Sequence, residues 1–93
     1  FYGRGKVRML KNDWDAAALD LDQAIKLSLA VQPIHWLARM RKGDSLYHAK
    51  RFEEATKELK FFLQKKFSES DPNFRFRAKA EFLLSECEKM MKN

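Results

Sequence analysis

The sequence is poor in cysteine, glycine and proline, and each shortage excludes a class of protein. The single cysteine, Cys87, rules out an internal disulfide framework and cannot by itself supply the roughly four ligands of a structural zinc site. Three glycines and two prolines in 93 residues are too few for the turns of a sheet-rich fold. No apolar run approaches the roughly 20 residues that cross a bilayer. We therefore expect one all-α domain without membrane insertion, inside the cell in a reducing compartment, cytoplasmic or organellar.

Signatures of catalysis and of cofactor binding are missing as well. His35 and His48 do not have the i,i+4 spacing of a helical metal pair, and no carboxylate between them completes a metal set. The sequence has no glycine-rich phosphate loop and no serine-centred nucleophile elbow. We therefore predict that the chain is not an enzyme and holds no cofactor, metal or small molecule.

A period of 38 residues is the strongest pattern that the sequence does contain. Four anchor positions recur at this spacing: Gly5 and Gly43, Trp14 and Phe52, Ala17 and Ala55, Leu21 and Leu59. A glycine inside a helix lets a second helix approach its backbone, the aromatic residue fills the corner of a helical hairpin, and the small alanine again permits close packing. Such hairpins hide their apolar faces only when they stack on one another.

These anchors resemble the tetratricopeptide repeat family over residues 1 to about 66. The resemblance implies antiparallel helical hairpins stacked as a short right-handed superhelix within a single domain, 1–93. It divides the chain into a first repeat (1–33), a second repeat (34–71) and a capping helix (72–93). The first helix of the first repeat is expected to be shorter than a full family helix. The unit of 38 residues is longer than the family's roughly 34. Arg8, Arg39 and Phe62 also depart from the residues usual in the family.

Five helices are expected, over residues 1–11, 14–30, 33–49, 52–66 and 72–91. Pro33 and Pro72 stand at first helical positions, where the missing N–H costs nothing, and Asp71 can cap the helix behind it. In the last helix, seven residues share one apolar arc: Phe76, Ala80, Leu83, Leu84, Cys87, Met90 and Met91. This helix should close the stack, with Cys87 as a small core residue.

The formal net charge of +6 at pH 7 is unevenly distributed along these helices. Residues 1–13, 34–51 and 73–93 carry +3, +4 and +2, whereas 14–33 and 52–72 carry −2 and −1. The first, third and fifth helices are therefore the basic ones. In the tetratricopeptide family the first helices of the hairpins line a concave groove, so the resemblance implies a groove that prefers an acidic ligand.

The family's groove register falls on eleven residues of this sequence: Tyr2, Lys6, Leu37, Arg41, Asp44, Tyr47, His48, Arg75, Lys79, Phe82 and Glu86. The resemblance implies a protein-interaction module, an adaptor, co-chaperone or assembly-factor segment. Its partner would be an acidic peptide or a C-terminal segment of another protein.

Two alternatives stay open. One is RNA binding, favoured by a sequence pI of about 9.6 and by basic and aromatic residues that alternate near the last helix. These residues are Phe74, Arg75, Phe76, Arg77, Lys79 and Phe82. Against it, Phe76 belongs to the apolar arc, and two hairpins are too few to read a base sequence. The other is that any single exposed cation is merely solvated and that Tyr47 and Phe82 serve packing.

Overall fold

The computed structural model describes residues 2–92, and over that range the chain is all-helical, as predicted. The elements are α1 (Tyr2–Leu10), α2 (Trp14–Leu27), α3 (Pro33–His48), α4 (Phe52–Gln64), the 3-10 turn η1 (Phe74–Phe76) and α5 (Arg77–Met91). Phe1, the expected start of the first helix, and Asn93 lie outside the described residues.

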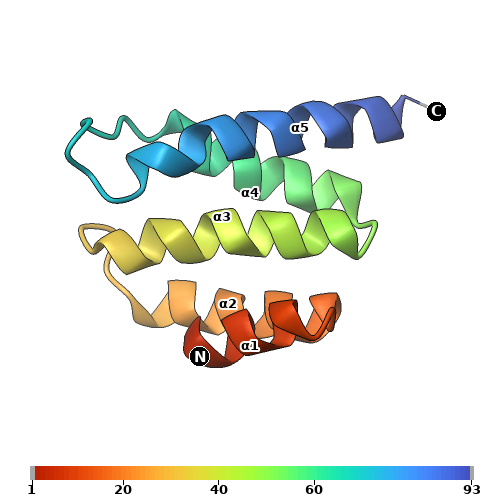
Figure 1. The fold of residues 1–93 in the computed structure, drawn as a ribbon, viewed down its shortest axis with the longest axis horizontal. Coiled ribbons are helices and arrows are strands. Elements are labelled where there is room, and N and C mark those ends of the chain that lie inside the picture. The colour runs from red at the N-terminus through yellow and green to blue at the C-terminus, as the bar shows by residue number, and fades with distance from the viewer. Residues whose placement is uncertain (1, 93) are drawn as a thin grey trace.

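Successive helices run antiparallel, and each packs against the next one along the chain (Figure 1). The corners inside the hairpins, α1–α2 and α3–α4, lie at one end of the long axis. The connections between units, α2–α3 and α4–α5, lie at the other end. Contact of α3 with α5 places the odd-numbered helices in one layer, with α2 and α4 in the other.

The 38-residue period is visible in the backbone of the two hairpin corners. Asn12 and Lys50 both adopt a left-handed conformation, with φ of 60° and 65°. The following N–H groups reach back five residues: Asp13 donates to Arg8 O at 2.8 Å, and Arg51 donates to Leu46 O at 2.9 Å. Both corners are thus Schellman-type helix ends, which satisfy the last carbonyls of α1 and α3 in the same way.

The two anchor glycines permit close helix contact, as their spacing predicts. A Cβ atom on Gly43 would lie 2.9 Å from Leu59 Cγ, and one on Gly5 would lie 2.9 Å from Leu21 Cγ. Real Cβ atoms do not come so close to other carbons, and both leucines are fully buried. Each hairpin therefore closes at a contact that only glycine permits.

The main core lies between α3, α4 and α5, and a smaller cluster joins α1, α2 and α3. Phe62, which departs from the family's usual alanine, is fully buried, and its ring lies 5.0 Å from that of Phe67. Cys87 is also fully buried, as expected for a small core residue. Ala80 and Leu83 of the predicted arc are buried too, whereas Met90 and Met91 are exposed, so the arc ends one turn early.

Three predicted helix boundaries are wrong. The second helix ends at Leu27 and the fourth at Gln64, so the connections between units are longer than expected. The fifth begins at Arg77 and not at Pro72, because the preceding segment is tied to α3. Asn73 is buried and donates its side-chain N–H to Pro33 O at 2.8 Å, while its backbone N–H donates to Asp71 Oδ1 at 2.8 Å.

Replacement of Gly43 by alanine tests the close approach. Overpacking typically costs about 1–3 kcal/mol, and the better helix propensity of alanine returns about 1 kcal/mol, so Gly43→Ala should lower the free energy of unfolding by up to about 2 kcal/mol. Gly3→Ala is the matched control, because a Cβ there has no atom within 4 Å. It should be neutral or slightly stabilising in the same urea titration. Equal stabilities of the two variants would contradict the proposed steric constraint.

Candidate functional site

A hollow of about 470 Å³ opens in the layer of odd-numbered helices, and we call it the basic groove. It is lined by Lys6, Met9, Leu10, Trp14, Arg41, Asp44 and Lys79. Its three cations come from α1, α3 and α5, the helices that the charge distribution identified as basic. Four of the predicted site residues, Lys6, Arg41, Asp44 and Lys79, therefore meet in one place.

Lys6 and Arg41 form a cationic wall that no anion of the described chain neutralises. Within residues 2–92, no carboxylate lies within ion-pair distance of either side chain. Arg41 Nε donates to the hydroxyl of Tyr2 at 3.0 Å, and Lys6 Nζ lies 5.9 Å from the centre of the Tyr2 ring. Tyr2 thus orients both cations without removing their charge. The remaining N–H groups of Arg41 can bind an incoming acceptor.

Asp44 forms the floor of the basic groove. Its side chain is nearly buried, with Oδ2 at 3.3 Å from Lys79 Nζ and Oδ1 at 3.1 Å from His48 Nδ1. The same His48 nitrogen lies 2.9 Å from the Asp44 backbone oxygen, and the His48 ring stacks on Trp14 at 4.4 Å between centroids. Asp44 therefore neutralises Lys79 in part, which leaves three cations against one carboxylate in the groove lining.

The rest of the groove lining is apolar, and we call it the apolar side of the groove. Met9 is partly buried, Trp14 is partly buried against His48, and Leu10 is 83% exposed. Trp14, which the sequence identified as a corner-filling residue, thus also borders the groove. An occupant of this hollow meets both positive charge and aliphatic and aromatic carbon.

The other predicted groove residues are placed elsewhere. Leu37 and Tyr47 pack against the main core, and the Tyr47 ring lies 5.9 Å from that of Phe52. Phe82 is exposed outside the groove lining, and Glu86 lies 3.5 Å from Lys89. The expected stripe of Arg75, Lys79, Phe82 and Glu86 on one helix is wrong at its start, because Arg75 belongs to η1 and stacks on Phe76 at 4.9 Å.

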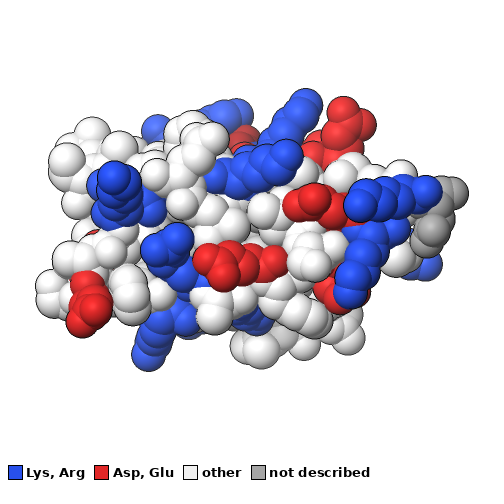
Figure 2. All heavy atoms as spheres, turned by 90° about the horizontal axis from the view of Figure 1, so that it is seen from above, with Lys and Arg blue, Asp and Glu red and all other residues white. Residues whose placement is uncertain are grey.

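The alternating basic and aromatic residues do not form one surface. Phe74, Arg75 and Arg77 border a separate hollow of about 370 Å³, where Arg77 lies 3.8 Å from Glu81. Phe76 packs against the main core, as its place in the apolar arc predicts, and Lys79 belongs to the basic groove. Cations and anions alternate over the face that carries α5 (Figure 2). The phosphate-binding and base-stacking groups of the alternative are therefore dispersed.

Comparison with known proteins gives no guide to this site. No protein-family model, curated protein or solved structure matches the chain. Between residues 2 and 92, every helix is too short or too polar to cross a membrane. No three His, Cys, Asp or Glu side chains of that range gather into a metal-binding set. The site must be interpreted from its own geometry.

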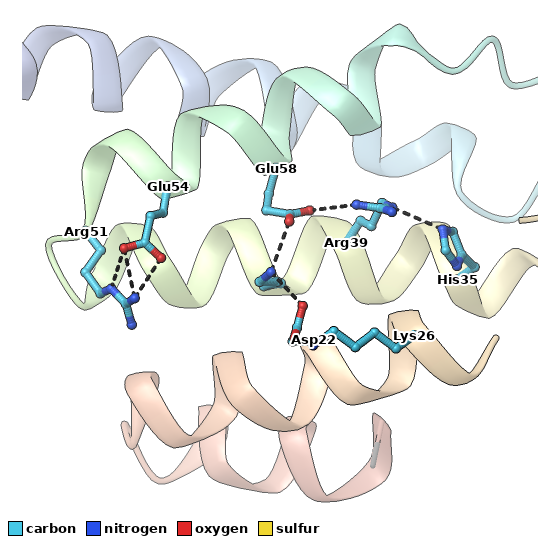
Figure 3. A network of polar contacts seen from close by, with 8 residues as sticks. Asp22, Lys26, His35, Arg39, Arg51, Glu54 and Glu58 are labelled. Atoms are coloured by element: carbon cyan, nitrogen blue, oxygen red, sulfur yellow. Dashed lines mark hydrogen bonds and ion pairs between the residues drawn. The ribbon is translucent and has the colours of Figure 1, made fainter.

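A second cluster of charged residues, which the sequence analysis missed, joins α2, α3 and α4 (Figure 3). Lys42 Nζ donates to Asp22 at 2.9 Å and to Glu58 at 3.0 Å, and Arg39 donates to Glu58 at 3.2 Å. Burial opposes the charge on Lys42, but its bonds to the two carboxylates outweigh burial and raise its pKa. Since residues 35, 39 and 42 lie opposite residues 41, 44 and 48 on the helical wheel, this cluster is separate from the groove.

The 38-residue period indicates one ion pair of this cluster. Arg4 and Asp20 form an ion pair at 2.8 Å inside the first hairpin, and Lys42 and Glu58, each 38 residues further on, form the corresponding pair in the second. Arg39, noted only as a departure from the family pattern, takes part as a partner of Glu58. A search for opposite charges at equivalent positions would have found these pairs.

His35 extends the cluster into the end of α2. The ring is buried, and its Nε2 accepts from Arg39 Nε at 3.1 Å, which leaves the proton on Nδ1, 3.0 Å from Ser28 Oγ. Burial and the positive charge of Arg39 lower the pKa of His35 below its ordinary value of 6.5. His35 is therefore neutral in the folded protein at pH 7.

The neutral His35 predicts a pH dependence of stability. Below about pH 6.5 the unfolded chain binds a proton that the folded chain does not, so the free energy of unfolding should fall as the pH drops from about 7 to about 5. Above that window this contribution is fully present. Urea titrations across the range should show a smaller fall for His35→Gln, whose side chain does not titrate. Parallel curves for the two proteins would show that another group is responsible.

Proposed function

We propose that this chain is a protein-interaction module of the adaptor or assembly-factor type, which binds an acidic peptide or C-terminal segment of a partner protein in the basic groove. The supporting observation is that Lys6 and Arg41 project into a hollow with no carboxylate of residues 2–92 near enough to pair with them. Cations held in place beside a cavity are suited to bind carboxylates, because charge-assisted hydrogen bonds are stronger than neutral ones.

The apolar side of the groove indicates which side chains a bound segment would carry beside its acidic residues. Met9, Leu10 and Trp14 border the same hollow, so a segment that carries an aliphatic or aromatic side chain beside its acidic residues would satisfy both sides at once. A segment of acidic residues alone would leave the apolar side uncovered. The resemblance of the anchors to the tetratricopeptide family, with its right-handed superhelix and its ligands on the odd-numbered helices, supports the same proposal.

RNA binding has less support from the same geometry. Its cations are divided between two hollows, and Phe76, which would have to stack on a base, packs against the core instead. Base stacking needs accessible ring faces beside a continuous phosphate track. RNA binding is therefore the alternative result that the binding experiment distinguishes from peptide binding.

Selection from a phage-displayed library of random peptides tests the proposal. Enriched sequences should place Asp or Glu next to Leu, Ile, Phe or Trp. Binding of a selected peptide to Lys6→Gln/Arg41→Gln should weaken by about ten-fold or more, since each lost charge-assisted bond contributes roughly 1.5–3 kcal/mol. Neither residue forms an ion pair with a carboxylate of residues 2–92, so the variant should fold normally.

The matched control for that variant is Lys57→Gln/Lys60→Gln, which removes two exposed positive charges from α4. It has the same net charge as the groove variant and should bind the peptide almost as well as the wild type. Equal losses in both variants would show that only net charge matters. A single-stranded RNA oligonucleotide that binds more tightly than any selected peptide would favour the alternative.

Substitution of Asp44 should act in the opposite direction. Asp44→Asn removes the anion from the groove floor and frees Lys79 for the ligand, so the same peptide should bind a few-fold more tightly. Isothermal titration of the wild type and the variant with one peptide measures this directly. Weaker binding would mean that Asp44 positions Lys79 for the ligand and does not compete with it.

A further inference from the structure

The connection between α2 and α3, with the helix residues on either side of it, presents aliphatic side chains to solvent. None of these residues lines the basic groove. Leu27, Leu29, Val31 and Ile34 are 70%, 66%, 86% and 40% exposed. No Asp, Glu, Lys or Arg occurs between Lys26 and Arg39. Single exposed aliphatic residues are normal on protein surfaces, but four within eight residues form a patch. We call these four residues the aliphatic corner.

Hydrogen bonds hold this corner in a defined shape. Leu29 N–H donates to Gln32 Oε1 at 2.8 Å, and Gln32 N–H donates back to Leu29 O at 2.9 Å. From α3, the indole N–H of Trp36 donates to Ala30 O at 2.6 Å. Four backbone polar groups of the turn, the N–H and carbonyl of Leu29, the carbonyl of Ala30 and the N–H of Gln32, are thus bonded within the protein, which lowers the cost of moving the turn out of water.

The fold does not require aliphatic residues at these positions. The positions 38 residues further on, in the connection between α4 and α5, hold Lys65, Phe67, Glu69 and Pro72. There Lys65 and Glu69 are exposed, whereas Phe67 is buried. The second connection therefore turns Phe67 inward and shows charge to solvent, and its exposed apolar residue, Phe74, is aromatic and not aliphatic. The outward aliphatic side chains are a property of the first connection alone.

Lysines flank the aliphatic corner. Lys65 Nζ lies 5.4 Å from the ring of Trp36, the residue that anchors Ala30, and Lys66 follows it in the chain. Lys26 precedes the corner at the end of α2, where its Nζ lies 2.9 Å from Asp22 Oδ2. Both connections lie at the same end of the 37 Å long axis, and they form a protruding end (Figure 1). Glu69 and Asp71 are the acidic residues of the second connection.

We propose that this end docks onto a lipid surface with anionic headgroups. The aliphatic corner enters the boundary between headgroups and acyl chains, and Lys65 and Lys66 meet the negative headgroups. A second copy of the chain is a poorer occupant. Two protruding ends bury little area against the roughly 1,200 Å² that a stable interface needs, and each copy carries a net charge of +6.

Flotation with lipid vesicles tests this proposal directly. The wild type should bind vesicles of phosphatidylcholine that contain phosphatidylserine, more weakly at higher salt, and should bind phosphatidylcholine alone far less. Leu29→Ser/Val31→Ser should lower binding by about ten-fold or more, because two aliphatic side chains no longer leave water. Leu19→Ser is the matched control, since Leu19 is an equally exposed leucine on α2 outside the corner, and it should bind like the wild type.

Two further variants separate the headgroup contact from the groove. Lys65→Gln/Lys66→Gln should lose most of the preference for phosphatidylserine, whereas the groove variant Lys6→Gln/Arg41→Gln should bind vesicles normally. Absence of wild-type binding, full binding by the corner variant, or loss of binding in the groove variant would overturn the proposal. So would sedimentation that shows a wild-type dimer which Leu29→Ser/Val31→Ser abolishes, because the occupant would then be a second copy.

Discussion

The close approach of paired helices at Gly5 and Gly43 is the constraint on which the rest of this structure depends. Leu21 and Leu59 fill the space where a Cβ atom would otherwise stand, so both hairpins close at the same separation. A hairpin closed so tightly needs a short corner, and a left-handed residue followed by a five-residue return bond supplies it in both units. Helix separation and corner geometry are therefore linked through one contact in each hairpin.

The position of α3 follows from stacking two such hairpins. It packs against α2 and α4 and touches α5, so few of its side chains reach open solvent. Polar groups on such a helix need partners, because an unpaired buried charge is costly. Asp44 finds Lys79 and His48 on one side, and Lys42 finds Asp22 and Glu58 on the other. Arg41 is left facing the basic groove, where it donates to the Tyr2 hydroxyl and lies 5.8 Å from the centre of the Phe76 ring.

Sequence reasoning predicted those features of the structure that depend on side-chain size and charge at a fixed spacing along the chain. The anchors, the five helices and the meeting of Lys6, Arg41 and Lys79 belong to this class. The start of α5 does not, because it depends on a hydrogen bond between Asn73 and Pro33, 40 residues apart in the chain. Gln32-Pro33 opens a helix and Asp71-Pro72 opens a turn, although the two dipeptides look alike in the sequence.

Two predicted groove residues lie outside the groove lining for a related reason. The family register assigns Leu37 and Tyr47 to a surface, but both are partly buried and pack against the main core between α3, α4 and α5. Phe62 and Phe67 enlarge that core. A bulkier core draws in neighbouring side chains that a smaller one leaves exposed, and a register transferred from other proteins cannot anticipate it. The surface role that the resemblance implies for these two positions therefore depends on the size of the core beneath them.

The chemistry of the molecule is concentrated where the two units differ. Lys6 and Asp44 occupy equivalent positions 38 residues apart, carry opposite charges and border the same groove. Leu29 and Phe67 are likewise equivalent, yet one faces solvent and the other the core. The glycines repeat because both hairpins need the same close contact, whereas Lys6 and Asp44 lie at a surface, where the two units are free to diverge. Core positions diverge as well, since Phe67 packs inward where Leu29 faces solvent, so divergence indicates a binding surface only where both equivalent residues border the same hollow.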